Sequence, residues 1–181
     1  LAVVIVLAVM FYRGNKASRE ETANRMLGEA RNAQALMAIR TQYPGTAAAK
    51  LALLQIAKSQ YDAGDYVMAM SSYGDFLTHY AKHPMVPMAE LGKIHCTEAM
   101  GQTAEALAAY KAFATRHQES YLTPLAVFGQ ARCLQQLRRY DEARATYEDF
   151  LAASPQTPWK GEIEDALKQI AREARKPLVA L

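Results

Sequence analysis

A spacing of 37 residues relates three segments of the chain. Each segment carries a tyrosine, with an alanine four positions before it and a phenylalanine three positions after it. The three sets are Ala69, Tyr73 and Phe76; Ala106, Tyr110 and Phe113; and Ala143, Tyr147 and Phe150. These offsets place all three side chains on one face of a helix, where the small alanine admits a neighbouring helix and the aromatic rings fill the space beside it. A period of this length predicts an all-α solenoid, in which each helical hairpin buries its apolar face against the next.

A second helix with its own matched positions precedes each of these segments. The equivalent residues are Ala52, Ala89 and Ala126; Leu54, Leu91 and Phe128; Ala57, Ile94 and Ala131; and Ser59, Cys96 and Cys133. Gly92 and Gly129 also match, although glycine inside a helix costs about 1 kcal/mol relative to alanine. We therefore expect two backbones to approach closely at these glycines.

Glycine and proline mark the ends of the predicted helices. Gly64 and Gly101 are suitable stop signals within two of the repeats, and Asp65 is a suitable cap for the helix that follows Gly64. The equivalent turn of the third repeat, residues 137–140, has no glycine and is less well defined. Six of the seven prolines fall between predicted repeats, where helices must end or begin: Pro44, Pro84, Pro87, Pro124, Pro155 and Pro158.

This combination of small and aromatic positions resembles the tetratricopeptide repeat (TPR), with a unit slightly longer than the usual length of about 34 residues. Residues 61–69 and 43–47 look like the turns of TPR proteins of the bacterial cell envelope, and the resemblance covers residues 36–170. It implies a protein-binding scaffold without catalytic activity, in which the first helix of each repeat lines a concave groove. The membrane-anchored ancillary TPR subunit of the Sec translocon is the closest of these proteins in layout.

The first twelve residues, Leu1 to Tyr12, are apolar and are followed by Arg13. A bilayer-spanning helix needs about 20 residues, so we expect this run to be the second half of a transmembrane helix, with Phe11 and Tyr12 at the interface. A signal-peptide core and a buried globular helix are the alternatives. Neither a small-residue cleavage site nor a lipid-anchor cysteine follows the run.

We thus expect five segments. They are a partial transmembrane helix at 1–12, a long juxtamembrane helix with a degenerate half-repeat at 13–45, three TPR-like repeats at 46–155, a capping helix at 156–175, and a tail at 176–181. The juxtamembrane helix is expected to run unbroken from Lys16 to about Gln42. By analogy with the envelope proteins, the repeats would lie in the periplasm, on a single-pass protein of a bacterial inner membrane. Arg13, Lys16 and Arg19 instead mildly favour the cytoplasmic side.

Little in the sequence indicates catalysis or the binding of nucleic acid, cofactors or metals. The net charge of +3 comes without a long basic run, which argues against nucleic-acid binding. No cofactor or small-molecule fingerprint occurs, and His79 and His83 would share a metal only if one helix contained both. Cys96 and Cys133 occupy equivalent positions about one helix diameter apart, too far for a disulfide, so we expect two free buried thiols.

One further column recurs at the 37-residue spacing and is the candidate binding site. It contains three bases, each four positions after an apolar residue, and one nearby tyrosine: Lys58, His95 and Arg132; Leu54, Leu91 and Phe128; and Tyr61. In TPR proteins these positions usually face the concave groove, where bases beside apolar side chains suit an extended peptide. The alternative is that the three bases only keep the helices soluble.

The sequence therefore predicts a membrane-anchored scaffold whose partners are an integral membrane complex or secretory client proteins. A permanent structural subunit of a larger membrane assembly is the alternative from the same fold. A metal-dependent enzyme is a remote third possibility.

Overall fold

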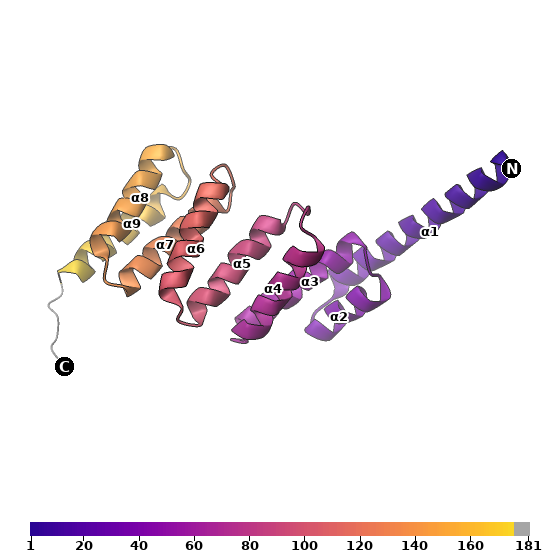
Figure 1. Ribbon diagram of the computed structural model, residues 1–181, viewed down its shortest axis with the longest axis horizontal. Coiled ribbons are helices and arrows are strands. Elements are labelled where there is room, and N and C mark those ends of the chain that lie inside the picture. The colour runs from indigo at the N-terminus through magenta and orange to yellow at the C-terminus, as the bar shows by residue number, and fades with distance from the viewer. Residues whose placement is uncertain (176–181) are drawn as a thin grey trace. The chain divides into compact units, whose positions relative to one another are not determined.

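The computed structural model describes residues 1–175, which form nine α-helices and no strand (Figure 1). The helices are α1 (Ala2–Glu29), α2 (Ala33–Gln42), α3 (Ala47–Asp62), α4 (Tyr66–His79), α5 (Val86–Ala99), α6 (Thr103–Arg116), α7 (Thr123–Gln136), α8 (Tyr140–Ala153) and α9 (Lys160–Ala174). The predicted all-α class is confirmed for this part of the chain. The chain divides into two compact units, one up to Ala89 and one from Glu90 onward. The predicted tail at 176–181 lies outside the described residues.

The three alanine, tyrosine and phenylalanine sets are buried as the repeat predicts. Ala69, Ala106 and Ala143 have no exposed surface, and the three tyrosines are at most 6% exposed. Phe76 and Phe113 are fully buried, and Phe150 packs half-buried against the core of the second unit. The residues that repeat every 37 positions are therefore the ones through which α4, α6 and α8 pack against their neighbours.

The helices of each repeat are joined by the same tight turn, including the turn without glycine. Gly64 and Gly101 have positive φ angles of 81° and 79°, and Arg138 takes the equivalent place with φ of 58°. The amide of Arg138 donates to the carbonyl of Gln135 at 2.9 Å, and the next amide donates to the carbonyl of Leu134 at 2.8 Å. These hydrogen bonds hold a non-glycine residue in the left-handed region, which L side chains normally avoid.

In the first unit, the expected single helix from Lys16 to Gln42 is wrong. The helix ends at Glu29, Ala30 is extended, and α2 begins after Asn32. Asn32 caps α2 by accepting a hydrogen bond from the amide of Ala35 at 2.8 Å, which satisfies a donor that a helix start leaves without a partner. The break lets α1 and α2 pack on each other and on α3, around Ala23, Leu36, Ile39, Ala48, Ala52 and Ile56.

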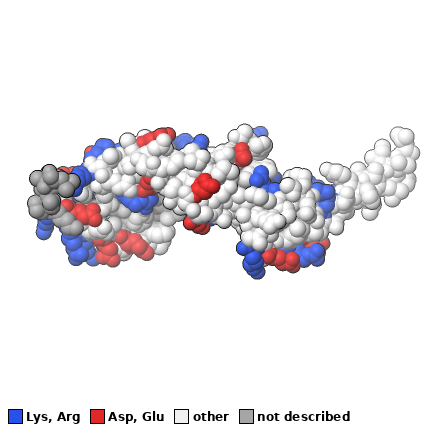
Figure 2. Space-filling view, turned by 90° about the horizontal axis from the view of Figure 1, so that it is seen from below, with Lys and Arg blue, Asp and Glu red and all other residues white. Residues whose placement is uncertain are grey.

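The first half of α1 extends beyond this packing (Figure 1). The large apolar side chains of residues 1–12 are 48–103% exposed, and the segment bears no Lys, Arg, Asp or Glu (Figure 2). Across residues 1–175, no helix combines the length and the apolarity that a membrane crossing requires. The expected transmembrane helix is therefore not found in the described part of the chain.

In the second unit, α9 covers the end of the helical stack. Ile163 and Ile170 are buried in the core, and Leu167 packs against it. The three residues recur at offsets of four and three along α9, which places them on one face of the helix. Cys96 and Cys133 are buried and free, as expected, and burial raises the pKa of each thiol to about 11. Both thiols therefore remain protonated at neutral pH.

Gly129 lies against the ring of Tyr110, where a Cβ atom would overlap the ring. The close approach that the sequence predicts at this glycine is thus present, but the neighbour is a tyrosine side chain and not a backbone. Gly129 has a helical conformation on α7 that any residue can adopt. Glycine is therefore needed here for the space that it leaves to the Tyr110 ring and not for its backbone freedom.

We expect Arg138→Gly to stabilise the protein by up to about 1 kcal/mol. The substitution removes left-handed strain of roughly 1–2 kcal/mol, and the greater flexibility of unfolded glycine offsets part of the gain. Urea unfolding measures the change. Gly101→Ala, at the equivalent turn, should destabilise by a similar amount. An Arg138→Gly variant no more stable than the wild type would show that the turn is not strained.

We expect Gly129→Ala to destabilise the protein by roughly 1–3 kcal/mol, the cost of overpacking a well-filled core. Thermal unfolding followed by circular dichroism measures the loss. Gly161→Ala is the control, because a Cβ at Gly161 in the first turn of α9 meets open space. Equal stability of the two variants would mean that Tyr110 moves aside without cost.

Candidate functional site

The residues of the predicted binding column fall in both units. Leu54, Lys58 and Tyr61 lie on α3 in the first unit, and the other four lie on α5 and α7 in the second unit: Leu91, His95, Phe128 and Arg132. The two groups have different surroundings. The column as a whole stays a prediction.

On α3, one face of the helix lines an apolar cavity of about 530 Å³. The α3 cavity is lined by Leu51, Leu54, Gln55, Lys58, Ser59, Asp62, Met85 and Met88. The six α3 residues recur at offsets of three, four, seven, eight and eleven, which is the spacing of one helix face. Two methionines complete the wall, and their unbranched, polarisable side chains adapt to different apolar partners.

Lys58 stands at the edge of this cavity with its charge compensated. Its Nζ atom lies 2.7 Å from both carboxylate oxygens of Asp62, one helical turn further along α3. Both side chains are largely exposed, so the pair contributes only about 0.3–0.5 kcal/mol to stability. An incoming carboxylate can therefore compete with Asp62 for Lys58 at little cost.

In the second unit, Arg132 pairs directly with Glu98, and His95 joins the same network through Tyr110. Arg132 donates two hydrogen bonds to Glu98, at 2.5 and 2.7 Å, in a bidentate ion pair. The hydroxyl of buried Tyr110 donates to Glu98 at 2.7 Å and lies 3.0 Å from His95 Nδ1. Because the single hydroxyl proton goes to Glu98, His95 donates its Nδ1 proton to the Tyr110 oxygen.

The pKa shifts of this network follow from its burial and pairing. Burial, then the charge of Arg132, lowers the pKa of His95 from 6.5, so the imidazole is neutral at pH 7. Burial opposes the ionisation of Glu98, but hydrogen bonds from Arg132 and Tyr110 outweigh it and lower the pKa of this carboxyl. The bond to Glu98 raises the pKa of Arg132, and burial followed by Glu98 raises that of Tyr110. The result is a neutral imidazole and a compensated ion pair.

The apolar members of the column belong mainly to the cores. Leu54 and Leu91 are 6% and 3% exposed. Phe128 makes edge-to-face contacts with Tyr147 and Trp159, with ring centroids 5.4 and 5.8 Å apart. In the first unit, the Tyr61 ring packs on Tyr66 with centroids 5.3 Å apart. Leu54 also lines the α3 cavity.

Glu98 is the central residue that sequence reasoning missed. It stands one repeat after Tyr61 and one repeat before Gln135, so the period gives no sign of an acid at this position. Its side chain is only 8% exposed, and an acid so deeply buried needs a cationic partner. One sequence signal could have pointed to Glu98. This acid follows His95 by three residues, a spacing that places the two side chains on one face of α5.

The described residues offer no metal centre. No group of three or more His, Cys, Asp or Glu side chains in residues 1–175 is arranged to hold a metal ion. Helix α4 ends at His79, so His83 lies beyond it, and the condition for a shared site is not met. His79 Nδ1 is 2.8 Å from the carbonyl of Asp75, and His83 Nδ1 accepts from the amide of Met85 at 3.2 Å.

The profile of the tetratricopeptide repeat-like domain matches residues 1–172. The chain belongs to this family. The comparison with curated proteins gives no match.

Two solved structures share the TPR fold. The Yersinia enterocolitica type III secretion chaperone SycD, solved with a peptide of the translocator YopD, is 23% identical with a TM-score of 0.54, over 67% of this chain and 91% of SycD. A tetratricopeptide repeat protein from Parabacteroides merdae is 17% identical with a TM-score of 0.60, over 88% of this chain and 62% of that protein. At these identities the likeness shows the fold alone. The link to the translocon subunit stays a prediction.

The His95 network predicts a loss of stability in weak acid. Because its folded pKa lies below 6.5, the folded state binds fewer protons than the unfolded state, so stability falls as pH drops below 6.5 towards the folded pKa. The Glu98 contribution is lost only below its ordinary value of 4.5. We expect His95→Gln, which keeps a donor for Tyr110, to flatten the slope between about pH 7 and pH 5 in urea unfolding.

His79→Gln is the control, since His79 lies outside the network. Its stability should depend on pH as that of the wild type does. An unchanged slope in His95→Gln would show that His95 is not the group that titrates.

Proposed function

We propose that this TPR-like chain is a non-catalytic scaffold that associates with a membrane and binds an extended peptide segment of a partner protein in the α3 cavity. The fold is one that mediates protein–protein interaction. The single observation that carries the binding part of the proposal is the cavity itself, an apolar concavity with a few polar groups at its edge.

The lining of the α3 cavity suits a peptide with an apolar anchor and a carboxylate. Leu51, Leu54, Met85 and Met88 supply the apolar wall. Lys58, held only by an exposed partner, supplies a cation that can bind the carboxylate. The presence of a translocator peptide in the SycD structure supports an occupant of this kind, because the two proteins share the fold.

The exposed start of α1 supports membrane association. Residues 1–12 present ten large apolar side chains to solvent, followed by Arg13 and Lys16. An apolar helix that ends in aromatic and then basic residues is typical of a segment leaving the hydrocarbon layer. A site in a bacterial inner membrane, with the repeats in the periplasm, is the part of the proposal that rests on the resemblance to envelope TPR proteins.

A photo-crosslinking amino acid placed at exposed Gln55, on the wall of the α3 cavity, tests the peptide part. In native membranes we expect crosslinks to extended segments of partner proteins, located by mass spectrometry. Met88→Glu should reduce them roughly tenfold or more, because burying a methionine contributes about 1.5–3 kcal/mol and a carboxylate there is desolvated.

Met68→Glu is the matched control. Met68 is 50% exposed on α4 and does not line the cavity, so this variant should crosslink like the wild type. Equal yields from both variants would contradict peptide binding in the α3 cavity. Recovery of the same membrane subunits in constant ratio from both variants would favour a permanent structural subunit.

A further inference from the structure

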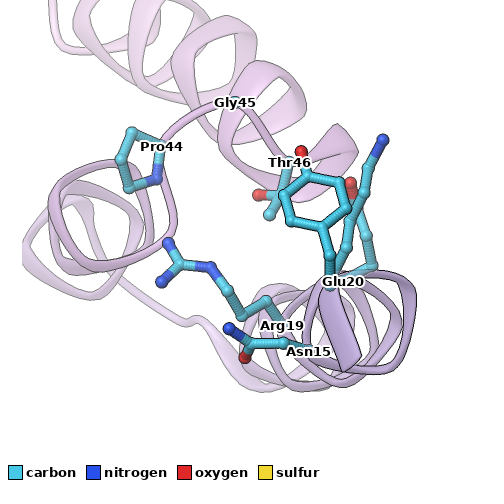
Figure 3. A pocket seen from close by; sticks show the side chains of 8 residues that line it. Asn15, Arg19, Glu20, Pro44, Gly45 and Thr46 are labelled. Carbon is cyan, nitrogen blue, oxygen red and sulfur yellow. The ribbon is translucent and has the colours of Figure 1, made fainter. Parts of the chain in front are cut away.

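A second pocket, of about 230 Å³, lies where α1 meets the turn between α2 and α3 (Figure 3). We call it the junction pocket. Asn15, Arg19 and Glu20 project into it from α1, opposite Pro44, Gly45 and Thr46 (Figure 3). Tyr12 and Lys16 complete its lining. Neither the repeat nor the α3 cavity uses these residues.

Glu20, the acid of the pocket, is already engaged. Its carboxylate accepts a hydrogen bond from the amide of Ala47 at 3.1 Å, which satisfies a free donor at the start of α3. Glu20 stands one helical turn after Lys16, a spacing that often gives an ion pair, but its carboxylate is turned toward α3. Lys16 therefore has no ion-pair partner among residues 1–175, although the charge of Glu20 remains in the same pocket.

Arg19 also lacks a carboxylate partner among the described residues. Its guanidinium donates to the carbonyl of Gln42 at 3.2 Å and lies 5.7 Å from the centre of the Tyr43 ring. These contacts fix the side chain across the pocket and leave further N–H donors of the guanidinium for another acceptor. The pocket thus holds two cations and one committed acid, a net positive charge that favours an anion.

The size and position of the pocket favour one kind of anion. A volume of 230 Å³ corresponds to roughly eight water molecules at about 30 Å³ each, enough for the phosphorus and four oxygens of a phosphodiester. Lys16 follows Tyr12 by four residues, or about 6 Å along the helix. The headgroup layer of a bilayer is about 5–7 Å thick, so Lys16 lies at headgroup depth if Tyr12 marks the edge of the hydrocarbon.

We propose that the junction pocket binds the phosphate of an anionic phospholipid, through Lys16 and Arg19 with Asn15 as an additional donor. This inference rests on the proposed membrane association of α1. Binding would tie the start of the repeats to the lipid surface, because Arg19 and Glu20 also hold the ends of α2 and α3.

The test uses the full chain and two kinds of vesicle, phosphatidylcholine alone and phosphatidylcholine with phosphatidylglycerol. We expect flotation with both, and tighter binding to the anionic vesicles. Lys16→Gln/Arg19→Gln should weaken that binding on the order of a hundredfold, since it removes two charge-assisted contacts. Lys16→Gln alone should cost roughly tenfold and leaves the Arg19 contacts with Gln42 and Tyr43 in place.

Arg13→Gln/Arg25→Gln removes the same charge from α1 at residues that do not line the pocket. Arg13 contributes only general surface attraction, and Arg25 lies about 20 Å beyond Tyr12, so the loss should be about fivefold. Equal losses from the two double variants would overturn the pocket and leave simple charge attraction. A wild type that floats equally with both vesicles would overturn it while membrane association stands, and no flotation at all would overturn both.

Inorganic phosphate without lipid distinguishes the two sources of the same chemistry. We expect it to leave the amide resonances of Gly45 and Thr46 unchanged and the anionic vesicles to shift them. A saturable shift with inorganic phosphate alone would assign the pocket to a free anion and overturn the lipid assignment.

Discussion

The burial of one aromatic stripe on the second helix of each repeat is the constraint on which the structure depends. Alanine four positions before the tyrosine is fully buried in all three repeats, and the tyrosine is nearly so. In the second unit this packing is tight enough that the Tyr110 ring fills the place of a side chain at Gly129. The turn between α7 and α8 has the same form as the glycine turns of the other two repeats, although Arg138 takes a left-handed conformation there.

Packing gives the three residues of the basic column, Lys58, His95 and Arg132, different roles. Equal spacing predicts three similar cations, but the described surroundings of the three residues differ. Lys58 is exposed beside Asp62, His95 is a neutral donor to Tyr110, and Arg132 is fixed by buried Glu98. The Glu98 side chain is only 8% exposed and depends on this cation, so Arg132, although half exposed itself, is better suited to linking α5 with α7 than to capturing a ligand. The adaptable apolar surface lies instead beside α3.

The junction of α1, α2 and α3 places polar chemistry next to an exposed apolar helix. Glu20 accepts a hydrogen bond from the first amide of α3, and Arg19 donates one to the last carbonyl of α2. Both ends of the turn are therefore bonded to α1. These contacts connect the apolar segment to the first repeat through short polar interactions. They also leave Lys16 and Arg19 without an ion-pair partner among the described residues.

The sequence by itself determined the helical class and the buried faces of α4, α6 and α8, because apolar periodicity records contacts along one element. It also determined the free cysteines, because equivalent positions of neighbouring repeats lie too far apart for a disulfide. It did not reveal the break before Asn32, since side-chain capping competes with a helix that the local pattern allows to continue. The role of Glu98 and the orientation of Glu20 were decided only by tertiary structure. Each acid finds a partner at least 27 residues away, and no local pattern encodes that choice.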